Sequence, residues 1–236
     1  MRVQYFDSYD AMSKVSAEMV MNTLCQKPDM MLCAATGNSP TGLYKELANA
    51  YQSDRSIFDQ LRIFKLDEWG DMEANVQASC EYYLQEHVLN PLQISGNRYI
   101  AFQNNPSDPK AECERVQGIL NQQGPIDICV LGLGANGHMG LNEPNEELQP
   151  HCHVAQLAEL TLSHGMIADI QPKPTYGMTI GIEDILASKH ILMLVVGSAK
   201  KQATDMLLSG EVTNEFPATH LQRHANVDCL IVRQEL

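Results

Sequence analysis

The sequence predicts an α/β domain built on a doubly wound, Rossmann-like sheet of mostly parallel strands, with helices on both faces. Apolar runs at residues 30–35, 126–131 and 191–196 are continuous rather than alternating, which is typical of strands buried on both faces. Segments with helical periodicity separate these runs, as expected where a crossover helix follows each parallel strand. The 236 residues are 44% hydrophobic, which suits a single domain spanning residues 1–236.

Eight strands are expected, at residues 3–6, 30–35, 61–66, 126–131, 154–157, 177–180, 191–196 and 227–232. Helices are expected at residues 8–24, 43–51, 76–88, 109–122 and 199–208, with a weaker helical pattern at residues 161–170. Asp7 or Ser8 can cap the first helix. In such sheets, ligands bind at the carboxyl ends of the strands. We therefore expect the site in the loops after residues 35, 66, 131 and 196.

The composition excludes several classes of partner. The formal net charge is −13, and no cluster of Lys or Arg is present, so neither a nucleic acid nor an anionic membrane is expected as a partner. No apolar run approaches the roughly 18 residues that a membrane helix needs. The seven cysteines form no Cys-x-x-Cys pair and no signal peptide is visible, which favours reduced thiols and a cytoplasmic location.

The segment after the second expected strand favours a phosphate-binding loop. It reads Thr36-Gly37-Asn38-Ser39-Pro40-Thr41-Gly42. Its glycines let backbone N–H groups turn inward, Ser39 and Thr41 add hydroxyl donors, and the following helix supplies a positive dipole end. It is not a P-loop, because Leu43-Tyr44 replaces the Lys and Ser/Thr of that motif. The alternative is an ordinary capped helix start.

Asp67 and Glu68 come directly after the strand at residues 61–66. A carboxylate at a strand end is partly desolvated, which raises its pKa toward the range of a general base. Acids at strand ends also commonly solubilise a loop or cap the next helix, so both interpretations stay open from the residues alone.

A glycine-rich turn with one histidine follows the strand at residues 126–131. It reads Leu131-Gly132-Leu133-Gly134-Ala135-Asn136-Gly137-His138-Met139-Gly140-Leu141-Asn142-Glu143-Pro144. The glycines match a G-x-G-x-x-G dinucleotide pattern, but Asn142 and Pro144 prevent the long helix that such a site needs. We therefore interpret His138 as an acid or base, with Asn136 and Glu143 as polar partners. The alternative is a structural turn histidine.

The remaining histidines give no metal motif. The pair His151 and His153 would share one face of a strand, but no two further ligands follow at suitable spacing. We expect neither a metal nor an organic cofactor.

Taken together, these segments resemble the glucosamine-6-phosphate deaminase family, including its galactosamine-6-phosphate deaminase/isomerases. Four blocks fall in the family's order over nearly the whole chain: residues 36–44, 66–69, 131–144 and 197–200. The resemblance implies a hexosamine 6-phosphate substrate that is isomerised and deaminated to a ketohexose 6-phosphate and ammonia. It implies no cofactor. Some relatives are hexamers, so the resemblance allows a homo-oligomer.

The resemblance also implies residue roles. Asp67 corresponds to the proton shuttle between C1 and C2, and Asn136, His138 and Glu143 correspond to the ring-opening residues. Lys200 corresponds to a phosphate-binding lysine. The substrate-binding set implied in this way is Thr36, Gly37, Asn38, Ser39, Thr41, Gly137, His164 and Lys200.

One position departs from the family's pattern. The phosphate-binding Arg of the glucosamine-6-phosphate enzymes corresponds to the segment 162–166, where His164 stands and no Arg or Lys is present. This difference favours the galactosamine-6-phosphate branch. Two rival interpretations remain: a 6-phosphogluconolactonase, which has a related glycine-rich turn, and a sugar-phosphate sensor domain that binds without turnover.

Overall fold

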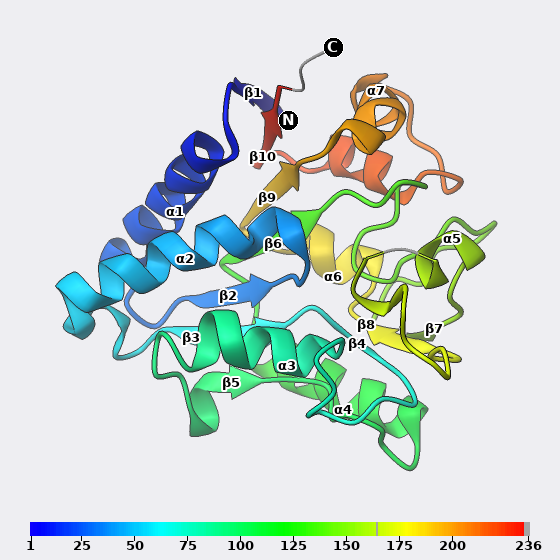
Figure 1. The fold of residues 1–236 in the computed structure, drawn as a ribbon, viewed down its shortest axis with the longest axis horizontal. Helices are drawn as coiled ribbons and strands as arrows, with labels where there is room; N and C mark the ends of the chain where they lie inside the picture. Colours follow the sequence, from blue (N-terminus) through cyan, green and yellow to red (C-terminus); the bar gives the residue numbers. More distant parts are fainter. Residues whose placement is uncertain (164, 234–236) are drawn as a thin grey trace.

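Seven parallel strands form the central sheet, in the order β1-β10-β9-β6-β2-β3-β5 (Figure 1). The structure is a computed structural model that describes residues 1–163 and 165–233. The strands are β1 (Arg2–Phe6), β2 (Met31–Ala34), β3 (Arg62–Lys65), β5 (Tyr99–Ile100), β6 (Ile128–Gly132), β9 (His190–Val195) and β10 (Val227–Val232). Every pairing between them is parallel, so the predicted fold class is confirmed.

Helices cover both faces of this sheet. Along β2 and β9, alternate side chains belong to two separate apolar cores, because successive residues of a strand point to opposite faces. One core packs against α1 (Tyr9–Gln26), α2 (Asn38–Ser53) and α3 (Cys80–Leu84). The other packs against α4 (Pro109–Gln123), α6 (Ile182–Leu186) and α7 (Lys201–Leu208). Both faces of the central strands are therefore closed to water, as their continuous apolar sequences require, whereas the edge strand β1 is largely exposed.

A second, three-stranded antiparallel sheet lies beside the first. It has the order β4-β8-β7 and consists of β4 (Asp67–Trp69), β8 (Gly177–Thr179) and β7 (His153–Ala155). The chain passes from one sheet to the other at Leu66, whose N–H bonds to Ala34 of β2 and whose carbonyl accepts from Ile180. The sequence predicted strands near residues 154–157 and 177–180 but not this separate sheet, and it predicted a loop where β4 lies.

Three predicted helices are wrong in extent. The helix expected at residues 43–51 is α2, which runs from Asn38 to Ser53. The helix expected at residues 76–88 begins only at Cys80, because Ser79 caps it by accepting from Tyr82 N–H, and it ends in the π-helical turn Gln85–Leu89. The weak helical pattern at 161–170 gives two short pieces instead, α5 (Glu159–Leu162) and a 3₁₀ turn, Gly165–Ile167. In the described part of the chain, no helix is long and apolar enough to cross a membrane.

Candidate active site

The four predicted site loops lie at one edge of the molecule. Strands β9, β6, β2 and β3 are consecutive neighbours and run parallel, so the segments that follow them emerge at the same edge. Neighbouring strands are about 4.8 Å apart. The ends of β2 and β9 are therefore about 10 Å apart, and the start of α2 and Lys200 follow these two strand ends on the same side of the sheet.

The expected phosphate loop is mostly the first turn of a helix. Helix α2 begins at Asn38, and Gly37 precedes it with φ +99°, a conformation that glycine adopts without strain. No side chain in the described part of the chain caps this helix end. Its amide groups and dipole therefore favour an anion there. Ser39 faces the Gly132 end of β6, since a Cβ on Gly132 would lie 3.9 Å from that of Ser39.

Thr41 does not present its hydroxyl to an anion in this structure. Its Oγ1 lies 2.9 Å from the Gly37 carbonyl oxygen and 2.7 Å from Tyr83 Oη. Because the helix already begins at Asn38, inside the expected loop, this side chain turns back along the helix. Thr41 therefore holds the shape of the Gly37 turn, together with Tyr83, which donates to the same carbonyl.

Lys200 ends the 3₁₀ turn Ser198–Lys200, directly before α7. It is half-buried, and burial lowers the pKa of its amine. Its neighbour Lys201 pairs with Asp205, whereas the described residues place no carboxylate within ion-pair distance of Lys200. A partly desolvated amine without a counterion suits an anionic ligand.

Asp67 lies in a dry position at the start of β4. It is 7% exposed, and β4 pairing sets it opposite Thr179. Burial and then the charge of Glu68 raise the pKa of Asp67 to about 7, against the opposing effects of a hydrogen bond from Cys80 and of His138 charge. A carboxyl group with a pKa near neutrality can both take and return a proton at working pH.

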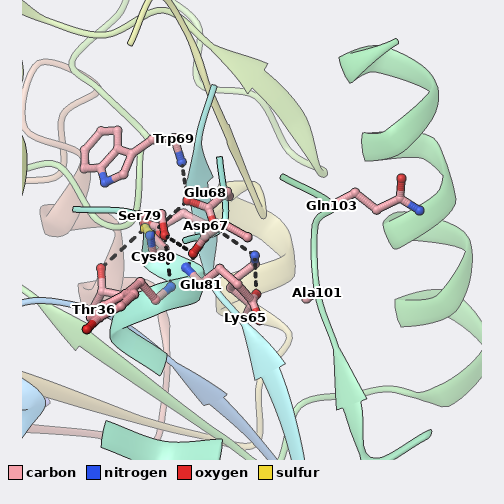
Figure 2. A network of polar contacts seen from close by, with 12 residues as sticks. Thr36, Lys65, Asp67, Glu68, Trp69, Ser79, Cys80, Glu81, Ala101 and Gln103 are labelled. Carbon is pink, nitrogen blue, oxygen red and sulfur yellow. Dashed lines mark hydrogen bonds and ion pairs between the residues drawn. The ribbon is translucent and has the colours of Figure 1, made fainter. Parts of the chain in front are cut away.

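Glu68 points to the opposite face of β4 and is held in a buried ion-pair network (Figure 2). Lys65, also fully buried, lies 2.8 Å from Glu68 Oε2 and 2.9 Å from Glu81 Oε2. The carboxylate of Glu68 also accepts from the backbone N–H groups of Trp69, Cys80 and Glu81. The ion pair with Lys65 and these three backbone donors compensate the carboxylate of Glu68 in its buried position next to Asp67.

His138, Asn136 and Glu143 form one hydrogen-bonded chain. Asn136 Nδ2 donates to Glu143 Oε2 at 2.8 Å, and Asn136 Oδ1 lies 2.7 Å from His138 Nδ1. Glu143 is held further from the imidazole, at 3.5 Å. Burial raises the pKa of Glu143, but interactions with His138, Thr161 and Asn136 outweigh that effect and lower it to about 2.

This chain fixes the tautomer of His138. An ionised Glu143 can only accept, so the amide nitrogen of Asn136 turns toward it and the amide oxygen turns toward the imidazole. His138 Nδ1 must then carry the hydrogen, which leaves Nε2 for chemistry. The structure has both contacts: His138 Nδ1 lies within ion-pair distance of Glu143 Oε2, as the predicted His–Glu pairing requires, and Asn136 also bridges the two side chains.

Glycines bring the histidine turn close to the Asp67 carboxylate. A Cβ on Gly140, which has φ +57°, would lie 3.4 Å from Asp67 Oδ2 and 2.7 Å from Thr179 Oγ1. A Cβ on Gly134 would overlap the imidazole of His138. Gly137 has φ +83° and packs under the ring of Phe216. The turn therefore folds tightly over β4, which brings the His138 chain and Asp67 to the same place.

His164 lies outside the described residues. A cavity of about 430 Å³ between α4 and β7 includes Glu143 in its lining but neither Asp67 nor His138. Across residues 1–163 and 165–233, no group of three His, Cys, Asp or Glu side chains is arranged to hold a metal ion.

Sequence reasoning missed Lys65, Cys80, Glu81 and Thr179 as neighbours of the site. The one available signal was a lysine inside an apolar strand directly before two acids. Such a lysine is buried only if it is paired. Cys80 and Thr179 carried no signal, because their proximity to Asp67 depends on how α3 and β8 pack.

Comparison with known proteins identifies the class. A model of the family described as glucosamine-6-phosphate isomerases/6-phosphogluconolactonase matches residues 7–230. The Escherichia coli (strain K12) protein named "Putative deaminase AgaI" is 38% identical over 97% of this chain and 91% of its own length. Glucosamine-6-phosphate deaminase 1 of Bacillus subtilis (strain 168) is 32% identical over 99% of this chain and 98% of its own.

Solved structures of similar proteins have the same fold as this chain. A monomeric glucosamine-6-phosphate deaminase superposes with a TM-score of 0.92 at 31% identity, covering 99% of this chain and 98% of that one. A 6-phosphogluconolactonase from Trypanosoma brucei has a TM-score of 0.78 at 19% identity, over 98% and 95% of the two chains, and shares the fold. The site and the fold thus define a sugar-phosphate enzyme class. The chain belongs to the glucosamine-6-phosphate isomerase/6-phosphogluconolactonase family.

The buried network predicts a large difference between two lysines. Lys65→Met leaves Glu68 and Glu81 buried without their cation, so we expect the free energy of unfolding to fall by about 3–5 kcal/mol. Lys201→Met removes an exposed ion pair with Asp205 and should cost less than about 1 kcal/mol. Urea unfolding of both variants measures this. Equal stabilities would show that Lys65 is not buried with these carboxylates.

Proposed function

We propose that this protein converts a hexosamine 6-phosphate to a ketohexose 6-phosphate and ammonia. The observation that carries the proposal is one carboxyl group with a near-neutral pKa, Asp67, beside a turn that holds an imidazole in one tautomer. The anion-favouring start of α2 and Lys200 lie at the same sheet edge and would hold the phosphate. Relatives and a solved structure at 31–38% identity that are named deaminases support this assignment.

Ring opening is the first step of the proposal. His138 Nε2 takes the proton from the C1 hydroxyl and returns one to the ring oxygen as the C1–O5 bond breaks. The imidazolium that forms between these transfers is stabilised by the Asn136–Glu143 chain, because Glu143 stays ionised. The product is the open-chain aldehyde, with its amino group still on C2.

Isomerisation follows at Asp67. The ionised carboxylate removes the C2 proton while the C1 oxygen takes up a proton, which gives an enolamine. The same carboxyl group then delivers its proton to C1, and the nitrogen gives up the proton that balances the one gained by the C1 oxygen. The ketimine formed at C2 adds water and releases ammonia, leaving a ketone. One sugar phosphate and one water are consumed, and one ketohexose 6-phosphate and one ammonia are formed.

Asp67→Asn tests the proposal. The amide that replaces the carboxylate cannot accept the C2 proton, so we expect kcat for ammonia release to fall at least about 10³-fold with KM nearly unchanged. Glucosamine 6-phosphate and galactosamine 6-phosphate are assayed in parallel, with 6-phosphogluconolactone as a third substrate. Near-normal kcat in the variant, or turnover of the lactone alone, would refute the proposed reaction.

Stability supplies a control for the same variant. Because the fold raises the pKa of Asp67, ionisation of this residue lowers the free energy of unfolding. The loss is absent below about pH 4 and grows as the pH rises to about 7. Asp67→Asn removes this cost. The variant should therefore be more stable than wild type at pH 8 and similar to it near pH 4, which urea unfolding measures.

The acidic limb of activity should follow Asp67. Free enzyme needs the ionised carboxylate, so kcat/KM should fall about tenfold per pH unit below a midpoint near 7. Glu68→Gln removes the neighbouring charge and should shift that midpoint to lower pH. Glu81→Gln, which removes the other partner of Lys65, is the matched control and should shift it less. A midpoint at or below about 5 in wild type would contradict the account.

A further inference from the structure

The thiol of Cys80 contacts the proposed shuttle directly. Cys80 Sγ lies 3.6 Å from Asp67 Oδ1 and 3.6 Å from Thr36 Oγ1 (Figure 2). Thr36 follows β2 and leads into the proposed phosphate site, so the thiol links that segment to the carboxylate. Cys80 is 1% exposed. Solvent therefore does not compete for these contacts.

The position of this thiol is set by the residue next to Asp67. Cys80 is the first residue of α3, and its backbone N–H donates to Glu68 Oε1 at 2.9 Å. The next N–H, of Glu81, donates to Glu68 Oε2 at 2.9 Å. The carboxylate of Glu68 thus holds the helix start, which places the Cys80 side chain against Asp67.

The direction of the hydrogen bonds follows from the chemistry of the groups. An ionised carboxylate can only accept, so the thiol donates its single proton to Asp67 Oδ1. The hydroxyl of Thr36 then donates to the sulfur. Burial and the nearby charges of Glu68 and Asp67 raise the pKa of Cys80 well above its usual range, so the thiol stays protonated and remains a donor.

The other oxygen of Asp67 faces the histidine turn. A Cβ on Gly140 would lie 3.4 Å from Oδ2, and glycine at this position leaves room beside that oxygen. Oδ1 is occupied by the thiol, whereas Oδ2 is directed toward the turn that carries His138. The two oxygens of the carboxylate are therefore in different environments.

We propose that Cys80 is a positioning residue that holds Asp67 by Oδ1, so that Oδ2 alone carries the proton from C2 to C1. This inference rests on the proposed function. The O–H formed when Oδ2 takes the C2 proton stays next to the sugar, because Oδ1 still accepts from the thiol. The carboxyl group does not need to rotate between the two transfers, and no second group is required to carry the proton from C2 to C1.

Replacement of Cys80 tests the role. Cys80→Ala removes the donor, so we expect kcat to fall about five- to tenfold, KM to change less than about twofold, and the acidic midpoint of kcat/KM to rise. Cys80→Ser keeps a donor and should recover most of both effects. Cys113→Ala removes another buried thiol, on α4, and should leave kcat and the midpoint unchanged.

A spectroscopic readout separates positioning from packing. The S–H stretching band, isolated as the infrared difference between wild type and Cys80→Ser, should shift as Asp67 titrates near pH 7, since a neutral carboxyl group accepts more weakly. A band that does not move with pH, or an unchanged kcat and midpoint in Cys80→Ala, would overturn this inference. The proposed function would survive that result, because it fails only if Asp67→Asn remains active.

Discussion

The burial of the Asp67 carboxylate beside the ionised Glu68 is the interaction on which the site depends. The parallel sheet holds the chain as far as Leu66, and the antiparallel sheet takes it over at Asp67. The carboxyl group is therefore placed by backbone pairing on both sides rather than by a loop. Burial and the adjacent charge raise its pKa to about 7, while Cys80 and His138 limit the rise. Proton exchange with a substrate carbon near neutral pH is the consequence.

The buried ion-pair network of Lys65, Glu68 and Glu81 holds the charge of Glu68 in place beside Asp67. Lys65 compensates both Glu68 and Glu81, and Tyr99 donates to Glu81 at 2.7 Å. The carboxylate of Glu68 is thus compensated in a dry site, while its charge raises the pKa of the adjacent Asp67. Ionisation of Asp67 lowers the stability of the fold. Groups that are destabilised in this way are commonly found at functional sites, where their perturbed pKa serves the chemistry.

Much of the fold followed from the sequence, because continuous apolar runs such as residues 126–131 and 191–196 leave few alternatives to a parallel sheet. The segments at Asp67 and His138 were also found from strand-end position and glycine density. The antiparallel sheet was not predicted, since β4 has only three residues and its pairing with β8 spans over a hundred residues. Likewise, the placement of Asn136 between His138 and Glu143, and the contact of Cys80 with Asp67, depend on tertiary geometry that no local pattern encodes.

The central claim is that Asp67 is held near neutrality by its surroundings, and a direct titration tests it. The protein would be labelled with ¹³C at the aspartate carboxyl carbons, and the Asp67 resonance assigned by its loss in Asp67→Asn. We expect its chemical shift to titrate with a midpoint near pH 7. A midpoint near 4, the ordinary value for an exposed aspartate, would contradict the account.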